Sequence, residues 1–169
     1  MFRIGPVLFL LVSVLLICWS GCDTHKMQGE FADQAFSPPK NYTHTDASGE
    51  IVKDNNAQPL EDPDDWRVAP SLPAPAIDVD PAYPNPASAQ EQIYVRVTIR
   101  FDVDLGGALH LAEPIGTRRL NELQAVQVTG IGTYILNFPA GQLGSTGLHR
   151  LVVVSGRGEI VTYGDVNVQ

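Results

Sequence analysis

The sequence predicts an all-β protein in which one antiparallel β-sandwich follows a disordered segment. Two observations carry this prediction. The C-terminal part contains short stretches in which apolar and polar residues alternate, and glycines and prolines separate these stretches. The part before it shows no such period, and ten of the chain's 13 prolines fall between Pro38 and Pro86.

The N-terminal residues have the three parts of an export signal. Arg3 supplies a positive charge, residues 7–17 form an uninterrupted run dominated by apolar side chains, and Ser20 and Gly21 are small residues at its exit. A transmembrane helix is the alternative, but it needs about 20 apolar residues, and this run is too short. We therefore predict a signal peptide over residues 1–21.

The exit of this signal resembles a known processing site. Trp19-Ser20-Gly21-Cys22 is similar to the lipobox of bacterial lipoproteins, a family that usually has Leu at the position of Trp19. The resemblance implies cleavage between Gly21 and Cys22, diacylglycerol on the thiol of Cys22, and acylation, typically with palmitate, of the new N-terminus. Cys18 is the competing site, but Ile17 before it is too large for the small-residue position.

Processing at Cys22 would place the protein in the bacterial cell envelope. Several acyl chains hold a protein stably on a membrane, whereas one chain binds only reversibly. The membrane is either the outer membrane or the periplasmic face of the inner membrane. Cys18 and Cys22 are the chain's two cysteines, so the mature protein would contain no free thiol and no disulfide.

Residues 22–75 have the composition of a tether. Between Cys22 and Asp80 there are 12 acidic residues against 4 Lys or Arg, whereas the rest of the chain, to Gln169, has 7 against 6. Because such a stretch has few apolar residues to bury, we expect it to be disordered and to hold the following domain roughly 40 Å from the lipid.

Trp66 interrupts this tether and is the only Trp outside the signal. A Trp exposed on a disordered linker is unfavourable, so one interpretation is that Trp66 docks on the sandwich and caps an edge or an end. The other interpretation is a short linear motif that captures a partner protein. The sequence leaves both open.

Residues 76–169 are predicted to form the sandwich. Apolar and polar residues alternate from Ile93 to Leu105, which predicts a long strand with one buried face. Residues 108–111 are expected to return from it, and residues 133–138 form another strand. The segment 116–126 is compatible with a helical turn or a loop.

The last 22 residues predict a β-hairpin, in which residues 148–154 and 159–168 pair across Ser155-Gly156-Arg157-Gly158. Pairing of Val154 with Glu159 places an apolar set on the core face, namely Leu151, Val153, Ile160, Val166 and Val168. The opposite face then carries Arg150, Val152, Val161, Tyr163 and Asp165. An Arg150–Tyr163 contact across the ladder would either stabilise the sheet or contact a partner.

Five to seven short strands without a long helix favour a sandwich of the immunoglobulin-like type. Ala82-Tyr83-Pro84-Asn85-Pro86, together with Gly147-Leu148-His149-Arg150-Leu151-Val152, also resembles the C-terminal immunoglobulin-like modules of secreted bacterial proteins. These include type IX secretion sorting domains and the sandwich of flagellar hook-capping proteins. The resemblance covers residues 77–169.

The residues offer little for catalysis or cofactor binding. His25, His44, His110 and His149 have no second ligand at metal spacing, so no metal site is expected. Asp102 and Asp104 share the polar face of one expected strand, where alternating charge is far commoner than a catalytic pair. Scattered Arg residues disfavour nucleic acid as a partner. We expect no cofactor and no enzyme activity.

Three functions remain open at this point. The first is a lipid-anchored module of the cell envelope that contacts an unknown envelope protein or polysaccharide through residues such as Trp66, Arg150 and Tyr163. The alternative is that the C-terminal domain acts as a sorting tail for type IX secretion. An enzyme or small-ligand carrier is the third.

Overall fold

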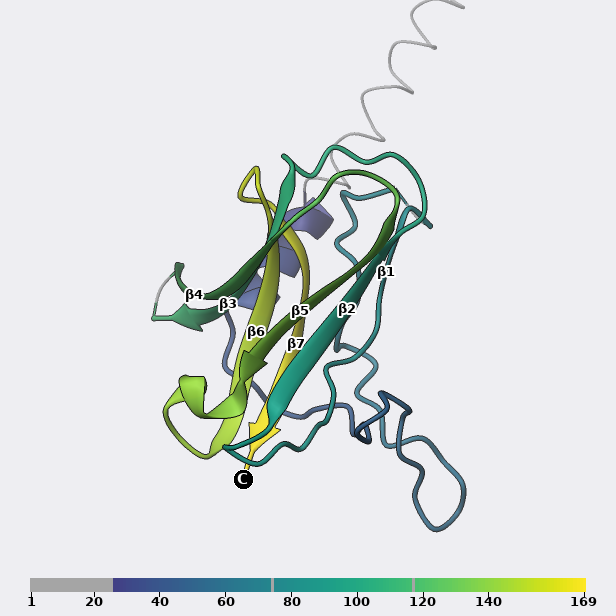
Figure 1. The fold of residues 1–169 in the computed structure, drawn as a ribbon, viewed down its shortest axis with the longest axis vertical. Coiled ribbons are helices and arrows are strands. Elements are labelled where there is room, and N and C mark those ends of the chain that lie inside the picture. Colours follow the sequence, from purple (N-terminus) through teal and green to yellow (C-terminus); the bar gives the residue numbers. More distant parts are fainter. Residues whose placement is uncertain (1–25, 74, 117) are drawn as a thin grey trace, which may run out of the picture.

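Two antiparallel sheets pack face to face in the computed structural model, which describes residues 26–73, 75–116 and 118–169 (Figure 1). The first sheet has the strand order β1-β2-β5, comprising β1 (Ile77–Val79), β2 (Gln92–Ile99) and β5 (Gly132–Pro139). The second has the order β4-β3-β6-β7, comprising β4 (Arg119–Gln127), β3 (Ala108–Ile115), β6 (Gly147–Ser155) and β7 (Ile160–Val168). A short 3-10 helix, η1 (Ala140–Leu143), connects β5 to β6.

This strand order confirms the predicted immunoglobulin-like sandwich. In that fold the first, second, fourth and fifth strands share one sheet, and the third, sixth and seventh share the other. Six of the seven strands occupy these positions here, whereas β4 pairs with β3 and therefore extends the second sheet. The edge strands β4 and β5 lie on the same side of the sandwich, because the Asn137 N–H of β5 donates to the Gln124 side chain of β4.

The core lies between the sheets and consists of the inward residues of the alternating strands. It is formed mainly by Ile93, Val95, Val97 and Ile99 of β2, Leu136 and Phe138 of β5, and Leu109, Leu111, Leu151 and Val153 of the second sheet. The C-terminal hairpin adds Val161, Val166 and Val168. Burial of these side chains is the main source of stability for a domain without disulfides.

The alternating stretch from Ile93 to Leu105 is not one strand. The strand β2 ends at Ile99, after which the Arg100 N–H donates to Ala76 O at 2.8 Å and the chain crosses to the second sheet. Phe101 points to solvent, whereas Leu105 is buried again. The apolar alternation in the sequence continues beyond the strand because the loop returns Leu105 to the core.

The segment 116–126, which the sequence left as a helical turn or a loop, forms most of strand β4. Its residues pair with β3 from Arg119↔Ile115 to Gln127↔Ala108, with a register shift between Leu111 and Ala112. Most β4 side chains are exposed or half-buried. An edge strand buries too few of its side chains to require a clear apolar period, which explains why the pattern did not indicate it.

The C-terminal hairpin is confirmed, with one change of register. Val154 pairs with Ile160 instead of Glu159, because a bulge lies between Val153 and Val154. As a consequence Ile160 lies on the outer face and Val161 packs in the main core, the reverse of the expected assignment. The bulge shifts one position of the period and leaves the rest of the pattern intact.

Residues 26–73, hereafter the arm, differ most from the expected tether, because buried residues on both sides of an exposed loop, among them Phe31, Thr45 and Trp66, pack against the sandwich. Helical residues 26–35 cover the outer face of β6 and β7 (Figure 1). There a second apolar cluster forms from Phe31, Ala35, Ala69, Ala112, Val152, Val154, Ile160 and Tyr163. Both faces of β6 and β7 are therefore buried.

Two aspartates order the part of the arm that has no apolar anchors. The Asp46 Oδ1 accepts hydrogen bonds from the N–H groups of Ser48 at 2.8 Å and Glu50 at 3.1 Å. Asp54 repeats this turn, accepting from the N–H groups of Asn56 and Gln58. The Ser48 hydroxyl, which also donates to Asp46, and these N–H groups lower the pKa of the Asp46 carboxyl, and the N–H groups at Asp54 lower the pKa of that carboxyl. The turns are thus fixed without burying a side chain.

Candidate functional site

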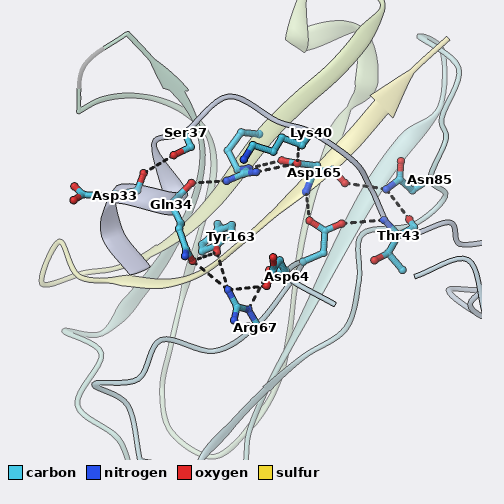
Figure 2. A network of polar contacts seen from close by, with 12 residues as sticks. Asp33, Gln34, Ser37, Lys40, Thr43, Asp64, Arg67, Asn85, Tyr163 and Asp165 are labelled. Atoms are coloured by element: carbon cyan, nitrogen blue, oxygen red, sulfur yellow. Dashed lines mark hydrogen bonds and ion pairs between the residues drawn. The ribbon is translucent and has the colours of Figure 1, made fainter. Parts of the chain in front are cut away.

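A network of polar contacts lies where the arm crosses the outer face of β6 and β7 (Figure 2). Arg150 of β6 and Tyr163 of β7 belong to it. The Arg150 Cζ atom lies 4.8 Å from the centroid of the Tyr163 ring, so the expected cross-ladder contact is present. Both side chains are largely covered by the arm, and this surface is occupied by the protein's own residues.

A buried ion pair forms the centre of the cluster. Arg150 and Asp165 are direct neighbours across the hairpin, and their side chains are 11% and 2% exposed. The Arg150 Nε donates to one oxygen of Asp165, and Nη2 donates to the other at 2.9 Å. This bidentate geometry offsets part of the cost of removing both charges from water.

The arm contacts both members of this ion pair. The Arg150 Nη1 donates to the main-chain oxygen of Gln34 at 2.6 Å, near the end of the helical residues, where unpaired carbonyls attract a positive charge. The Lys40 N–H donates to the Asp165 Oδ2 at 3.2 Å. The ion pair therefore fixes the arm on the sheet at two points.

Asp65 is the third charged group of the cluster. Its carboxylate accepts hydrogen bonds from the N–H of Thr43 at 2.9 Å and from the N–H of Asp165 at 3.0 Å. Burial raises the pKa of Asp65 to about 7, and the negative charge of Asp165 adds to the effect. A carboxyl with this pKa is partly protonated at neutral pH.

Tyr163 and two arm residues share a further set of hydrogen bonds. The Tyr163 hydroxyl donates to the Gln34 Oε1 at 2.7 Å. The Arg67 Nη2 donates to that hydroxyl at 3.1 Å and to the Gln34 Oε1 at 3.2 Å. The tyrosine thus connects the helical residues with the segment around Arg67, and Figure 2 shows the three side chains converging.

Residues that precede β7 in the sequence cover its outer edge. The Asn85 Nδ2 donates to the main-chain oxygens of Thr43 and Asp165, and its Oδ1 accepts from the N–H of Asn167 at 2.9 Å. The Ala87 N–H donates to the Asn167 oxygen at 2.9 Å. An exposed strand edge invites pairing with another chain, and these contacts block it.

Trp66 closes the same edge nearer its beginning. The Trp66 N–H donates to the Tyr163 oxygen at 2.7 Å and the Ala69 N–H to the Val161 oxygen at 2.8 Å, so this segment pairs with β7. The indole is 4% exposed and lies directly over Gly164. Of the two interpretations left open, the structure shows docking on the sandwich.

The remaining polar candidates lie apart from this cluster. The His149 Nδ1 lies 2.9 Å from the Glu113 Oε1, and the His110 Nδ1 lies 2.6 Å from the Glu122 Oε2, so each forms a local pair. Asp102 lies in the loop after β2, and Asp104 pairs there with Arg157. Within residues 26–73, 75–116 and 118–169 no three acidic, His or Cys side chains are grouped as metal ligands.

A hollow of about 150 Å³ opens beside Asp65. Five of the side chains that line it already bind other groups of the chain, namely Gln34, Asp65, Arg150, Tyr163 and Asp165. These hydrogen bonds and ion pairs form within the chain, and they hold the arm on the sheet. Sequence reasoning singled out Arg150 and Tyr163 but not Gln34, Asp65 or Asn85, whose partners lie up to 129 residues away.

The predicted lipidation site, Cys22, lies outside the described residues, as does the cleavage position between Gly21 and Cys22. In the part of the chain that is described, no helix has the length and apolar character needed to cross a membrane. No protein-family model matches the sequence, and a search of curated proteins finds no match.

Proposed function

We propose that this protein is a lipid-anchored component of a bacterial cell envelope that presents a small, non-catalytic β-sandwich as a structural or interaction module. The observation that carries the proposal is the short apolar run followed by Trp19-Ser20-Gly21-Cys22. Acyl chains on Cys22 would hold the module on the membrane. Its partner would be an envelope protein or polysaccharide.

The geometry of the polar cluster supports a structural role. Arg150, Asp165 and Asp65 are each satisfied by groups of the same chain, and they join the arm to the last two strands. A ligand or substrate would have to displace the arm to reach them. The cluster is therefore suited to producing one compact unit from the arm and the sandwich.

Metabolic labelling tests the anchor. Cells that express the wild-type protein, Cys22→Ala or Cys18→Ala are grown with radioactive palmitate, and membranes are separated from soluble protein. We expect label and membrane association for the wild type and for Cys18→Ala, which is the matched control. Cys22→Ala is expected to lose the label and to keep its signal peptide.

Mass spectrometry of the membrane-bound protein completes the test. The mature chain is expected to begin at an acylated Cys22 and to end at Gln169. A chain that still carries Met1, or a Cys22→Ala variant that still takes up the palmitate label, would contradict the proposal. Removal of the sandwich from the mature protein would instead favour the sorting-tail function.

A further inference from the structure

The direction of the arm shows which end of the sandwich lies next to Cys22. The Ser71 N–H donates to the Gln28 side chain, and Ser71 follows Ala69, which pairs with Val161 near the beginning of β7. Further along the arm, Gln34 contacts Tyr163 and Lys40 contacts Asp165. Residues 28–40 of the arm therefore run along β7 from its beginning to its end, and Lys26 lies towards the β6–β7 turn.

Two other loops lie at this end of the sandwich. Ile99 at the end of β2 pairs with Gly132 at the beginning of β5, so residues 100–107 and 128–131 extend past the same end of the first sheet. The Gly156 N–H in the β6–β7 turn donates to the Leu105 oxygen, which connects that turn to the first loop. Figure 1 shows these loops around the beginning of the helical residues.

This end carries the most exposed large apolar side chains of the described chain. Ile131 is 67% exposed and Phe101 is 56% exposed. Met27, at the beginning of the helical residues, is also exposed. Exposed apolar side chains on neighbouring loop tips are typical of a surface that contacts an apolar phase or a partner.

Two ion pairs also lie on or beside these loops. Arg100 pairs with Asp78 at 2.7 Å, and Arg157 pairs with Asp104, all with exposed side chains. Arginine can keep its guanidinium among polar headgroups while its aliphatic part lies on apolar surface. An apolar tip beside such ion pairs suits the boundary between acyl chains and headgroups.

The short connection between Cys22 and Lys26 indicates which surface this end faces. Three residues separate Cys22 from Lys26, so four peptide units join them. Four peptide units span at most about 14 Å, compared with the roughly 40 Å expected for a tether of 50 residues. Acyl chains on Cys22 would therefore hold the beginning of the helical residues close to the lipid surface.

We propose that the sandwich lies with this end on the membrane, with Phe101 and Ile131 inserted among the lipid headgroups. The inference rests on the proposed acylation of Cys22. The anchor supplies the stable attachment, and the short connection keeps the loops at a high local concentration of lipid, so a weak intrinsic affinity is sufficient. Phe101 and Ile131 then orient the module.

Fluorescence quenching by lipids tests the orientation. A fluorophore is attached to Ile131→Cys or, as the control at the opposite end, to Thr146→Cys, in the full-length acylated protein. Acylation leaves the mature chain without another free thiol. In vesicles of phosphatidylethanolamine and phosphatidylglycerol that carry a lipid-bound quencher, we expect at least twofold stronger quenching at position 131 than at position 146. Equal quenching in vesicle-bound protein would overturn the inference while leaving the anchor intact.

The same measurement separates failure of the orientation from failure of the anchor. Protein that stays in the supernatant when vesicles are sedimented would contradict the proposed function itself. A Phe101→Ser substitution in the Ile131→Cys background is expected to reduce quenching by about half, because it removes an apolar side chain from the end that faces the lipid. Phe101 is exposed, so its loss leaves the core unchanged. Leu148→Ser, at the opposite end, is the matched control, and an equal reduction by both substitutions would contradict the proposal.

Discussion

The arm and the sandwich are both ordered, but different interactions hold them in place. Alternating apolar residues bury the inner faces of both sheets, and the strands need little else. The arm has few apolar anchors, chiefly Phe31, Ala35, Trp66 and Ala69, and its backbone is fixed by individual polar side chains. Hydrogen bonds to a neighbouring strand can therefore order a segment that has no alternation of apolar and polar residues.

Polar residues of the arm are buried where a composition rule places them in solvent. Thr43 and Thr45 are both buried, and the Thr45 hydroxyl donates to the Ala82 oxygen at 2.6 Å. Composition rules for disorder count apolar residues and net charge, and they do not detect hydrogen bonds to residues far along the chain. This is the physical reason why the arm resembles a tether in sequence.

The largest effect is expected where the arm enters the main core. A Cβ atom added at Gly164 would lie 2.2 Å from the Trp66 ring, so Gly164→Ala must displace the indole. We expect Trp66→Ala and Gly164→Ala each to lower the free energy of unfolding by about 3–5 kcal/mol. In a double-mutant cycle by urea denaturation, the double variant should cost little more than either single one.

Gly29 provides the control for this cycle. It lies among the helical residues, and nothing surrounds the position of an added Cβ. Gly29→Ala is therefore expected to be neutral or to stabilise by up to about 1 kcal/mol. Additive losses from Trp66→Ala and Gly164→Ala would show that the indole does not lie over Gly164.

A smaller effect is expected from the ion pair under the arm. Arg150→Met leaves Asp165 buried without its cation and should lower the free energy of unfolding by about 3 kcal/mol. Adding Asp165→Asn to that variant removes the uncompensated charge, so we expect the double variant to be more stable than Arg150→Met alone. Thermal denaturation followed by circular dichroism measures both.

The exposed pair Arg157–Asp104 is the comparison. Arg157→Met is expected to change the free energy of unfolding by less than about 1 kcal/mol, because water screens an exposed pair. Equal losses for Arg150→Met and Arg157→Met would mean that the arm does not bury the first pair in solution.

The smallest effect concerns pH. The folded protein retains the Asp65 proton up to a pKa of about 7, whereas the unfolded chain releases it near 3.8. Stability should therefore fall as pH rises from about 4 through 7, by roughly 1–2 kcal/mol after allowance for partial exposure.

Denaturation at pH 5 and pH 8 measures this dependence on pH. Asp65→Asn is expected to remove most of it, whereas Asp54→Asn should keep it because the pKa of Asp54 is lowered. An unchanged slope in Asp65→Asn would contradict the assignment to Asp65.

The fold of the sandwich was predictable because its strands carry their own period. The strands β2, β5, β6 and β7 follow from alternation and turn residues alone. Alternation does not predict three other features, because each depends on a neighbouring strand. These are the end of β2, the bulge after Val153 and the pairing of β4.

The candidate site could be predicted only in part, for a related reason. Arg150 and Tyr163 share one hairpin, so a local ladder brings them together. Asp65, Gln34 and Asn85 join them from distant parts of the chain, and no local pattern marks these residues. Trp66 was noticeable as an isolated aromatic residue, which was sufficient to suggest docking but not its position over Gly164.

Strand β7 has a particular consequence for the order in which the molecule is completed. It is synthesised after every other described strand, yet its residues provide the hydrogen-bond partners for Trp66, Asp65 and Asn85. The first half of the chain must therefore wait for its end, and contacts so distant in sequence form slowly. A chain that lacks β7 would lose an edge strand of its second sheet and the support of its arm in a single step.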